Sequence, residues 1–213
     1  MTGERRLTAR GSARRTSLLD AAEKVLVTSG NAAASLRAVA AEAGVRIGHL
    51  QHFFPTRADL IHAVLARALD RSLHRLAGTT GFRPAADDDA PAPAADPAAT
   101  VTALLAEHDD PHLVRLYVEV WALAARDEDI APVVRAFYRT YVAHVEDFVR
   151  RCRPDLPAGD RRARAETFVA LLEGAALMRS GIAGTRSAAL DRHLVRQAVR
   201  LLTGPPEEEP PSL

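Results

Sequence analysis

The amino-acid sequence predicts an all-α protein of about nine helices. Apolar residues recur at spacings of three and four in one segment after another, which is typical of amphipathic helices. Val, Ile, Thr and aromatic residues nowhere alternate with polar residues over the length of a strand. The 213 residues are 47% hydrophobic and 26% charged, an ordinary balance for a globular protein. Because no apolar run reaches about 18 residues, we expect no membrane span.

The first helix is predicted over residues 14–29. Its apolar face comprises Leu18, Leu19, Ala22, Val25 and Leu26. Gly30 and Asn31 follow and favour the left-handed backbone that ends a helix. Ser35 is a good N-cap for a short second helix that runs to Ala43.

Gly44 then supplies a turn that few other residues can make at low cost. Val45, Leu50 and either Phe53 or Phe54 are spaced to anchor another short helix over residues 46–54. Pro55 ends that helix, and Thr56 is a good N-cap for a fourth helix from Arg57 to about Leu76. Two short helices joined by a tight glycine turn predict a helix-turn-helix arrangement.

The second helix of a helix-turn-helix presents its N-terminal side chains to the major groove of DNA. Here the candidates for this role are Arg46, Ile47, Gly48, His49, Gln51 and His52. Arg and Gln make paired hydrogen bonds to base edges, and a glycine lets the backbone approach closely. We assign Leu50, Phe53 and Phe54 to the core instead.

Charge is distributed unevenly along the chain although the net charge is only +1. Residues 1–57 hold nine Lys and Arg against four Asp and Glu, whereas the remainder holds 19 against 23. A local basic excess is the electrostatic signature of a polyanion-binding surface, and a solvated charged face is the alternative.

Residues 14–65 resemble the N-terminal domain of the TetR family of bacterial repressors. The matching positions are Ala21-Ala22, Val39-Ala40, Ala43-Gly44-Val45, Gly48, Leu50, Phe54, Thr56-Arg57 and Leu60. The sequence departs from the family pattern at Gln51, where a phosphate-contacting Tyr is usual. It also departs at Arg46 and Ile47, where Ser or Thr and a polar residue are common, so the operator sequence does not follow from the resemblance.

The resemblance implies that DNA phosphates are held by Arg57 at the start of the fourth helix, together with Thr56, Ser35 and Arg37. A helix N-terminus is a favourable place for an anion. It also implies a homodimer that binds a palindromic operator in double-stranded DNA.

The C-terminal part reads as at least five further helices behind a Pro-, Ala- and Asp-rich stretch. Residues 161–182 are apolar on two sides, so this helix must be covered on two sides. Together with the last helix it suits a four-helix bundle across a two-fold axis. We therefore expect a DNA-binding domain over residues 1–56 and a ligand-binding and dimerisation domain over 57–204. A mobile loop is expected at about 78–98 and a disordered tail at 205–213.

A small, largely apolar organic effector is expected between the helices of this part, since aromatic residues recur along their faces. The candidate contacts are Arg115, Tyr117, Trp121, Phe137, Tyr141, His144, Phe168, Leu172 and Glu173. An aromatic stripe at helical spacing is also what a plain core produces, so core packing is the alternative for each.

Enzymatic signals are weak in this sequence. His108 and His112 flank two aspartates, but Pro111 interrupts the helix that would align them as metal ligands. No nucleophile elbow, phosphate loop or HExxH motif is present. We expect a cytoplasmic DNA-binding regulator without a metal or cofactor. A ligand-binding or adaptor protein that does not bind an operator is the alternative, and a helical enzyme is the less favoured one.

Overall fold

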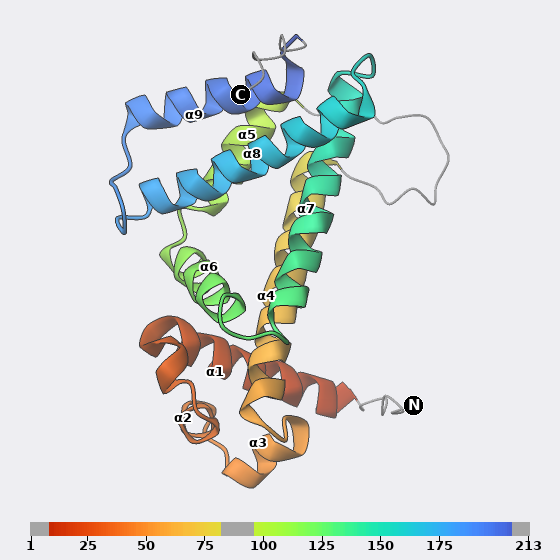
Figure 1. The fold of residues 1–213 in the computed structure, drawn as a ribbon. Helices are drawn as coiled ribbons and strands as arrows, with labels where there is room; N and C mark the ends of the chain where they lie inside the picture. Colours follow the sequence, from red (N-terminus) through yellow and green to blue (C-terminus); the bar gives the residue numbers. More distant parts are fainter. Residues whose placement is uncertain (1–8, 82–95, 206–213) are drawn as a thin grey trace. The chain divides into compact units, whose positions relative to one another are not determined.

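The computed structural model describes residues 9–81 and 96–205, and every named element over these ranges is a helix (Figure 1). In chain order they are α1 (Ala9–Ala33), α2 (Leu36–Glu42), α3 (Ile47–Phe53), α4 (Arg57–Thr80), α5 (Pro97–Glu107), α6 (Pro111–Ala124), α7 (Ala131–Cys152), α8 (Ala158–Arg179) and α9 (Ala188–Thr203). The predicted all-α class is confirmed.

The chain forms two compact units. Among the described residues, the first unit comprises 9–69 and 115–134, and the second comprises 70–81, 96–114 and 135–205. The boundaries fall inside α4, α6 and α7, so each of these helices contributes residues to both units.

The core of the first unit is made of the apolar faces of α1 to α4. Leu18, Leu26, Leu50 and Leu60 are completely buried and Phe54 almost so. Burial of each such side chain contributes about 1.5–3 kcal/mol to folding. The core fixes how α3 lies on α1 and α2, which leaves the opposite face of α3 open to solvent.

The first helix is longer than the sequence predicted. It starts at Ala9 and continues to Ala33, with a kink where Gly30 adopts a positive φ of 75°. The glycine therefore breaks the helix at the predicted place, although one more turn follows. Glu119 of α6 stabilises this turn, because its Oε2 accepts a hydrogen bond from the backbone N–H of Asn31 at 3.1 Å.

The second unit is organised around α8 and α9, which pack side by side, with α5 packed against both (Figure 1). Its completely or almost completely buried side chains include Val101, Val145, Phe148, Val149, Ala165, Phe168, Leu172, Ala198 and Leu202. The loop predicted at 78–98 is shorter at both ends, since α4 runs to Thr80 and α5 begins at Pro97. The rest of that prediction, residues 82–95, lies outside the described residues.

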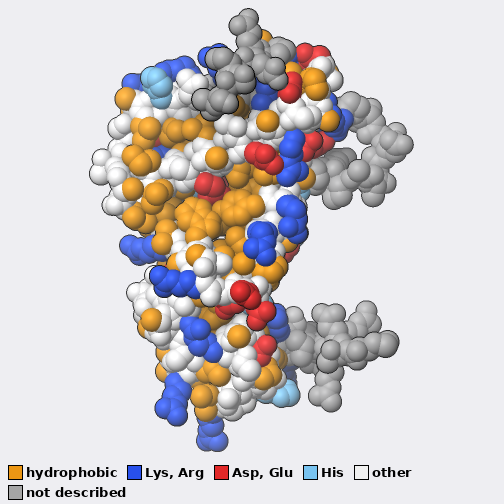
Figure 2. Space-filling model, in the orientation of Figure 1, with side chains coloured by type: hydrophobic (Ala, Val, Ile, Leu, Met, Phe, Trp, Pro, Cys, Tyr) orange, Lys and Arg blue, Asp and Glu red, His pale blue; other side chains and the backbone are white. Residues whose placement is uncertain are grey.

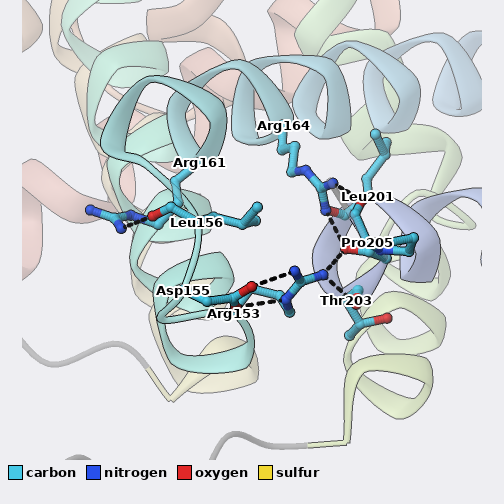
Figure 3. A network of polar contacts seen from close by, with 9 residues as sticks. Arg153, Asp155, Leu156, Arg161, Arg164, Leu201, Thr203 and Pro205 are labelled. Atoms are coloured by element: carbon cyan, nitrogen blue, oxygen red, sulfur yellow. Dashed lines mark hydrogen bonds and ion pairs between the residues drawn. The ribbon is translucent and has the colours of Figure 1, made fainter. Parts of the chain in front are cut away.

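Two arginines hold the C-terminal end of α9 (Figure 3). Arg153 donates to the carbonyl oxygens of Thr203 and Gly204, and Arg164 donates to those of Leu201, Gly204 and Pro205. The last carbonyls of a helix have no partner within the helix and carry partial negative charge, so two guanidinium groups stabilise this end. Pro205, predicted to begin a disordered tail, is therefore bonded, and residues 206–213 lie outside the described residues.

Candidate nucleic-acid interface and effector site

The tight turn between α2 and α3 forms as predicted. Gly44 adopts a φ of 63°, which favours glycine, and the backbone N–H of Val45 donates to the carbonyl of Ala40 at 2.9 Å. Ser35 caps α2 by accepting a hydrogen bond from the N–H of Ala38 at 3.2 Å. These contacts fix the angle at which α3 leaves α2.

The outer face of α3 is solvent-exposed over its whole length. The six residues predicted to read DNA, Arg46, Ile47, Gly48, His49, Gln51 and His52, are all exposed. Beneath them Leu50 is fully buried. Phe53, which the sequence assigned to the core, is only half-buried, and the rings of His49 and His52 pack against it edge-on at 5.6 and 5.3 Å.

At the start of α4, Thr56 and Asp59 cap the helix by hydrogen-bonding to each other. The backbone N–H and the hydroxyl of Thr56 both donate to Oδ2 of Asp59, at 3.0 and 2.7 Å, and the N–H of Asp59 donates back to the Thr56 hydroxyl at 3.1 Å. The hydrogen bonds from Thr56 lower the pKa of Asp59. This arrangement confirms Thr56 as the N-cap of α4.

Arg57 has partners within the first unit. Its Nε donates to the carbonyl of Ala34 at 3.0 Å, and Nη2 donates to the carbonyl of Asn31 at 2.6 Å and to the Asn31 side chain. Ser35 and Arg37, by contrast, are exposed. Arg57 therefore ties α4 to the turn between α1 and α2, a contact that the sequence does not reveal.

Two arginines of α1 also contact α3, and sequence reasoning missed this. Nε of Arg14 donates to Nε2 of His49 at 3.2 Å, and the guanidinium of Arg15 lies 5.2 Å from the centre of the Phe54 ring. In the sequence both arginines contribute only to a basic excess, and no spacing signal links them to α3. Figure 2 shows Lys and Arg side chains over the end of the first unit that α2 and α3 form.

The predicted effector contacts are divided between the two units. Arg115, Tyr117 and Trp121 belong to the first unit, and the other six belong to the second. Tyr117 and Trp121 are half-buried, with ring centres 6.4 Å apart. Arg115 is exposed.

In the second unit, α7 carries an aromatic row. Phe137 packs edge-on against Tyr138 at 5.0 Å and against Tyr141 at 6.0 Å between ring centres. His144, one turn further on, is buried, and burial lowers its pKa. Phe168 and Leu172 on α8 are completely or almost completely buried.

Glu173 stands out on α8 as a half-buried carboxyl group. Burial raises its pKa to about 7, and a hydrogen bond with the Tyr138 side chain opposes part of this rise. A half-buried acid that titrates near neutrality is a frequent feature of binding sites.

One cavity inside the second unit is lined in part by Phe168, with Thr80, Thr100, Leu104, Val145, Phe148 and Leu202. Its volume is about 10 Å³, far below the several hundred Å³ of an organic ligand site. Among the predicted contacts, Phe168 thus lies at a core packing defect too small for an effector.

Asp109, in the turn before α6, belongs to a network of ion pairs. Asp109 binds Arg179 at 2.8 Å and Arg186 at 2.6 Å, and Asp191 binds the same two arginines at 2.8 Å each. His108 is half-buried, and burial followed by the charge of Arg179 lowers its pKa. This network joins the turn before α6 to the start of α9.

Comparison with known families identifies both parts of the chain. Residues 18–64 match the family model of bacterial regulatory proteins of the tetR family. Residues 93–204, more than half of the chain, match the model of the C-terminal domain of BetI-type transcriptional repressors. The chain belongs to the TetR family.

Solved structures of TetR-like regulators have the same fold at low sequence identity. A transcriptional regulator from Rhodococcus sp. Rha1 is 22% identical with a TM-score of 0.66, covering 88% of this chain and 93% of that one. Salmonella enterica GusR is 20% identical, with a TM-score of 0.70 and coverages of 92% and 98%. The multidrug binding protein EbrR, solved in complex with imidazole, is 24% identical, with a TM-score of 0.64 and coverages of 91% and 97%. No curated protein matches the chain.

As a member of the TetR family, the protein is a DNA-binding transcriptional regulator with an N-terminal helix-turn-helix. Proteins of this family act on transcription and are not typically enzymes. Within the described ranges, no helix is both long and apolar enough to cross a membrane.

Proposed function

We propose that this TetR-family protein is a repressor that binds a palindromic operator as a homodimer and is released by a small, largely apolar organic effector. The observation that carries the proposal is the exposed face of α3, where Arg46, His49 and Gln51 stand over the buried Leu50. The BetI-type repressor description of the C-terminal match supports the repressing direction.

The DNA contacts divide into two classes. Base edges are read by Arg46, Ile47, Gly48, His49, Gln51 and His52, while phosphates are held by Ser35, Arg37 and Thr56. Arg37 is exposed at the start of α2, where the helix dipole favours an anion. We assign Arg57 to positioning, because its guanidinium already holds the turn that presents Ser35 and Arg37.

The effector is proposed to contact the aromatic side chains of α7 and the carboxyl group of Glu173 on α8, both in the second unit. Aromatic rings supply apolar area, and a single carboxyl group orients a ligand. Tyr117 and Trp121 on α6 stay predicted contacts. EbrR is a multidrug binding protein of the same fold, which is in keeping with an organic effector here.

The homodimer is proposed to form through α8 and α9. Two large apolar side chains, Met178 and Ile182, are 46% and 57% exposed at the end of α8 and just beyond it. Figure 2 shows hydrophobic side chains on the surface over this unit. Since the partner of a DNA-bound regulator is chromosomal DNA, we place its action in the cytoplasm.

Fluorescence anisotropy against the DNA upstream of the protein's own gene tests the proposal. We expect tight binding of one palindromic duplex, and Gln51→Ala should weaken that duplex by roughly 1–3 kcal/mol while affecting unrelated DNA far less. Arg139→Ala, at an exposed position of α7 outside the proposed DNA-reading and dimer surfaces, is the matched control and should leave binding unchanged. Absence of binding to every upstream duplex would favour the adaptor or enzyme alternatives.

A further inference from the structure

Helix α1 reaches the DNA-reading surface through two consecutive arginines. Arg14 bonds His49 in the exposed row of α3, and Arg15 lies over the ring of Phe54 at the C-terminal end of α3. One helix thus holds the reading helix near both of its ends. The Arg14 contact is the one at the exposed face, because His49 is exposed while Phe54 is buried.

The hydrogen bond defines the chemistry of the pair. An arginine Nε only donates, so Nε2 of His49 is the acceptor and the ring hydrogen stands on Nδ1. The edge-on contact with Phe53, at 5.6 Å between ring centres, fixes the plane of the imidazole. The single acceptor atom of the pair is therefore already used.

The groups of the Arg14–His49 pair that stay available to a ligand are all hydrogen-bond donors. Arg14 keeps four further N–H groups on Nη1 and Nη2, and His49 keeps its Nδ1–H. Both side chains border an open hollow of about 620 Å³, lined by Arg10, Gly11, Ala13, Arg14, Ser17, His49 and Phe53. The pair is consequently accessible from the α1 side of the reading surface.

Among base edges in the major groove, guanine offers two adjacent acceptors, O6 and N7. Adenine and cytosine each place an amino donor there, which a donor-only pair rejects, and thymine offers one acceptor beside a methyl group. We propose that Arg14, which lies outside the recognition helix, is a specificity-determining residue and that the Arg14–His49 pair selects guanine in each operator half-site. This inference rests on the proposed reading of DNA by α3.

The test uses a duplex that the wild-type protein selects from a random DNA pool. We expect a fixed guanine in each half-site, and replacing it with 7-deazaguanine, which lacks the N7 acceptor, should weaken wild-type binding roughly 5- to 150-fold. Arg14→Ala should bind the guanine and 7-deazaguanine duplexes equally. Arg14→Lys keeps the charge but not the planar fork, so it should retain attraction to DNA and lose most of the guanine preference.

Arg10→Ala is the control, since it removes the same charge one turn earlier on α1 and should keep the 7-deazaguanine effect. Thermal melting of each variant establishes that the first unit remains folded. If Arg14→Ala still loses affinity on the 7-deazaguanine duplex as strongly as the wild type does, Arg14 touches only phosphate and the inference is overturned. If the wild type selects no duplex at all, DNA recognition by α3 and this inference fail together, whereas selection of a duplex without a fixed guanine overturns the inference alone.

Discussion

Arg57 lies at the start of α4, where the family resemblance placed a phosphate contact, yet its guanidinium is hydrogen-bonded to Ala34 and Asn31. Hydrogen bonds from a charged donor to buried or half-buried carbonyls contribute about 1.5–3 kcal/mol. We therefore propose that the side chain acts on DNA binding through the α1–α2 turn rather than by its charge.

Arg57→Ala should lower the free energy of unfolding by about 1–3 kcal/mol and leave the salt dependence of operator binding nearly unchanged. Arg37→Ala should do the reverse, with little effect on stability and a decrease of about one unit in the slope of log K against log salt concentration. Denaturant unfolding and anisotropy at several salt concentrations measure both quantities. An equal fall in slope for the two variants would restore Arg57 as a phosphate contact.

Glu173 makes stability depend on pH, and the sign follows from the direction of its shift. Its pKa is raised from 4.5 to about 7 in the folded protein, so the folded state binds more protons than the unfolded state between these values. The protonated carboxyl contributes stability that is complete below about pH 4.5 and is lost as the pH rises through about 7.

Glu173→Gln should abolish this loss, which amounts to at most roughly 3 kcal/mol. Melting temperatures of the wild type and the variant from pH 5 to 8 should converge at low pH and separate at high pH, with the variant more stable. Comparing the two proteins cancels the titration of His108 and His144, which both share. Parallel curves over the whole range would contradict a raised pKa.

At the scale of the element, the short helices α2 and α3 and their turn could be predicted because each local signal is strong. Ser35, Gly44 and Thr56 have the capping or turn roles that their residue types predict. Contacts between elements could not be predicted in the same way. The bonds of Arg57 to Asn31 and of Arg14 to His49 join residues 26 and 35 positions apart, and nothing in the spacing of either pair marks it.

The two glycines of the helix-turn-helix should respond oppositely to alanine. Gly48 lies in α3 with open space where an alanine Cβ would lie and with no positive φ, so Gly48→Ala should stabilise the helix by about 0.5–1 kcal/mol. Gly44 has equally open surroundings but a φ of 63°, so Gly44→Ala should destabilise through backbone strain by about 1–2 kcal/mol.

Gly48→Ala also tests whether the backbone of α3 contacts the operator. If the backbone at Gly48 approaches the DNA closely, Gly48→Ala weakens operator binding while raising the melting temperature. Anisotropy and thermal melting on the same preparations show whether stability and affinity move in opposite directions. A variant that is more stable and binds equally well would remove Gly48 from the interface.

At the scale of the whole molecule, dimerisation sets whether two reading helices reach two half-sites together. Met178→Asp replaces an exposed apolar side chain of α8 with a charged one, so the protomer should remain folded. Dimerisation would bury this charge without a partner, so the variant should be monomeric. Light scattering with size-exclusion chromatography measures the mass, and operator affinity should fall in parallel. Ala103→Asp, which adds the same charge at an exposed position on α5, should remain dimeric. A dimeric Met178→Asp would move the interface away from this end of α8.

Helix α4 is unbroken from Arg57 to Thr80 and contributes residues to both units, which makes it a candidate for carrying the effector signal. An effector that favours the DNA-incompetent state with a coupling of about 1–3 kcal/mol weakens operator binding roughly 5- to 150-fold, and the operator must weaken effector binding by the same factor.

Replacing Asp70 and Arg71 with two glycines makes α4 flexible at the boundary between the units, at a helical cost of about 2 kcal/mol relative to two alanines. The double-glycine variant should still bind operator and effector separately, with a coupling factor close to one. The double-alanine variant should keep the wild-type factor. Titrating effector with and without operator, and operator with and without effector, measures the cycle from both sides. Equal coupling in the two variants would show that the signal does not require a rigid α4.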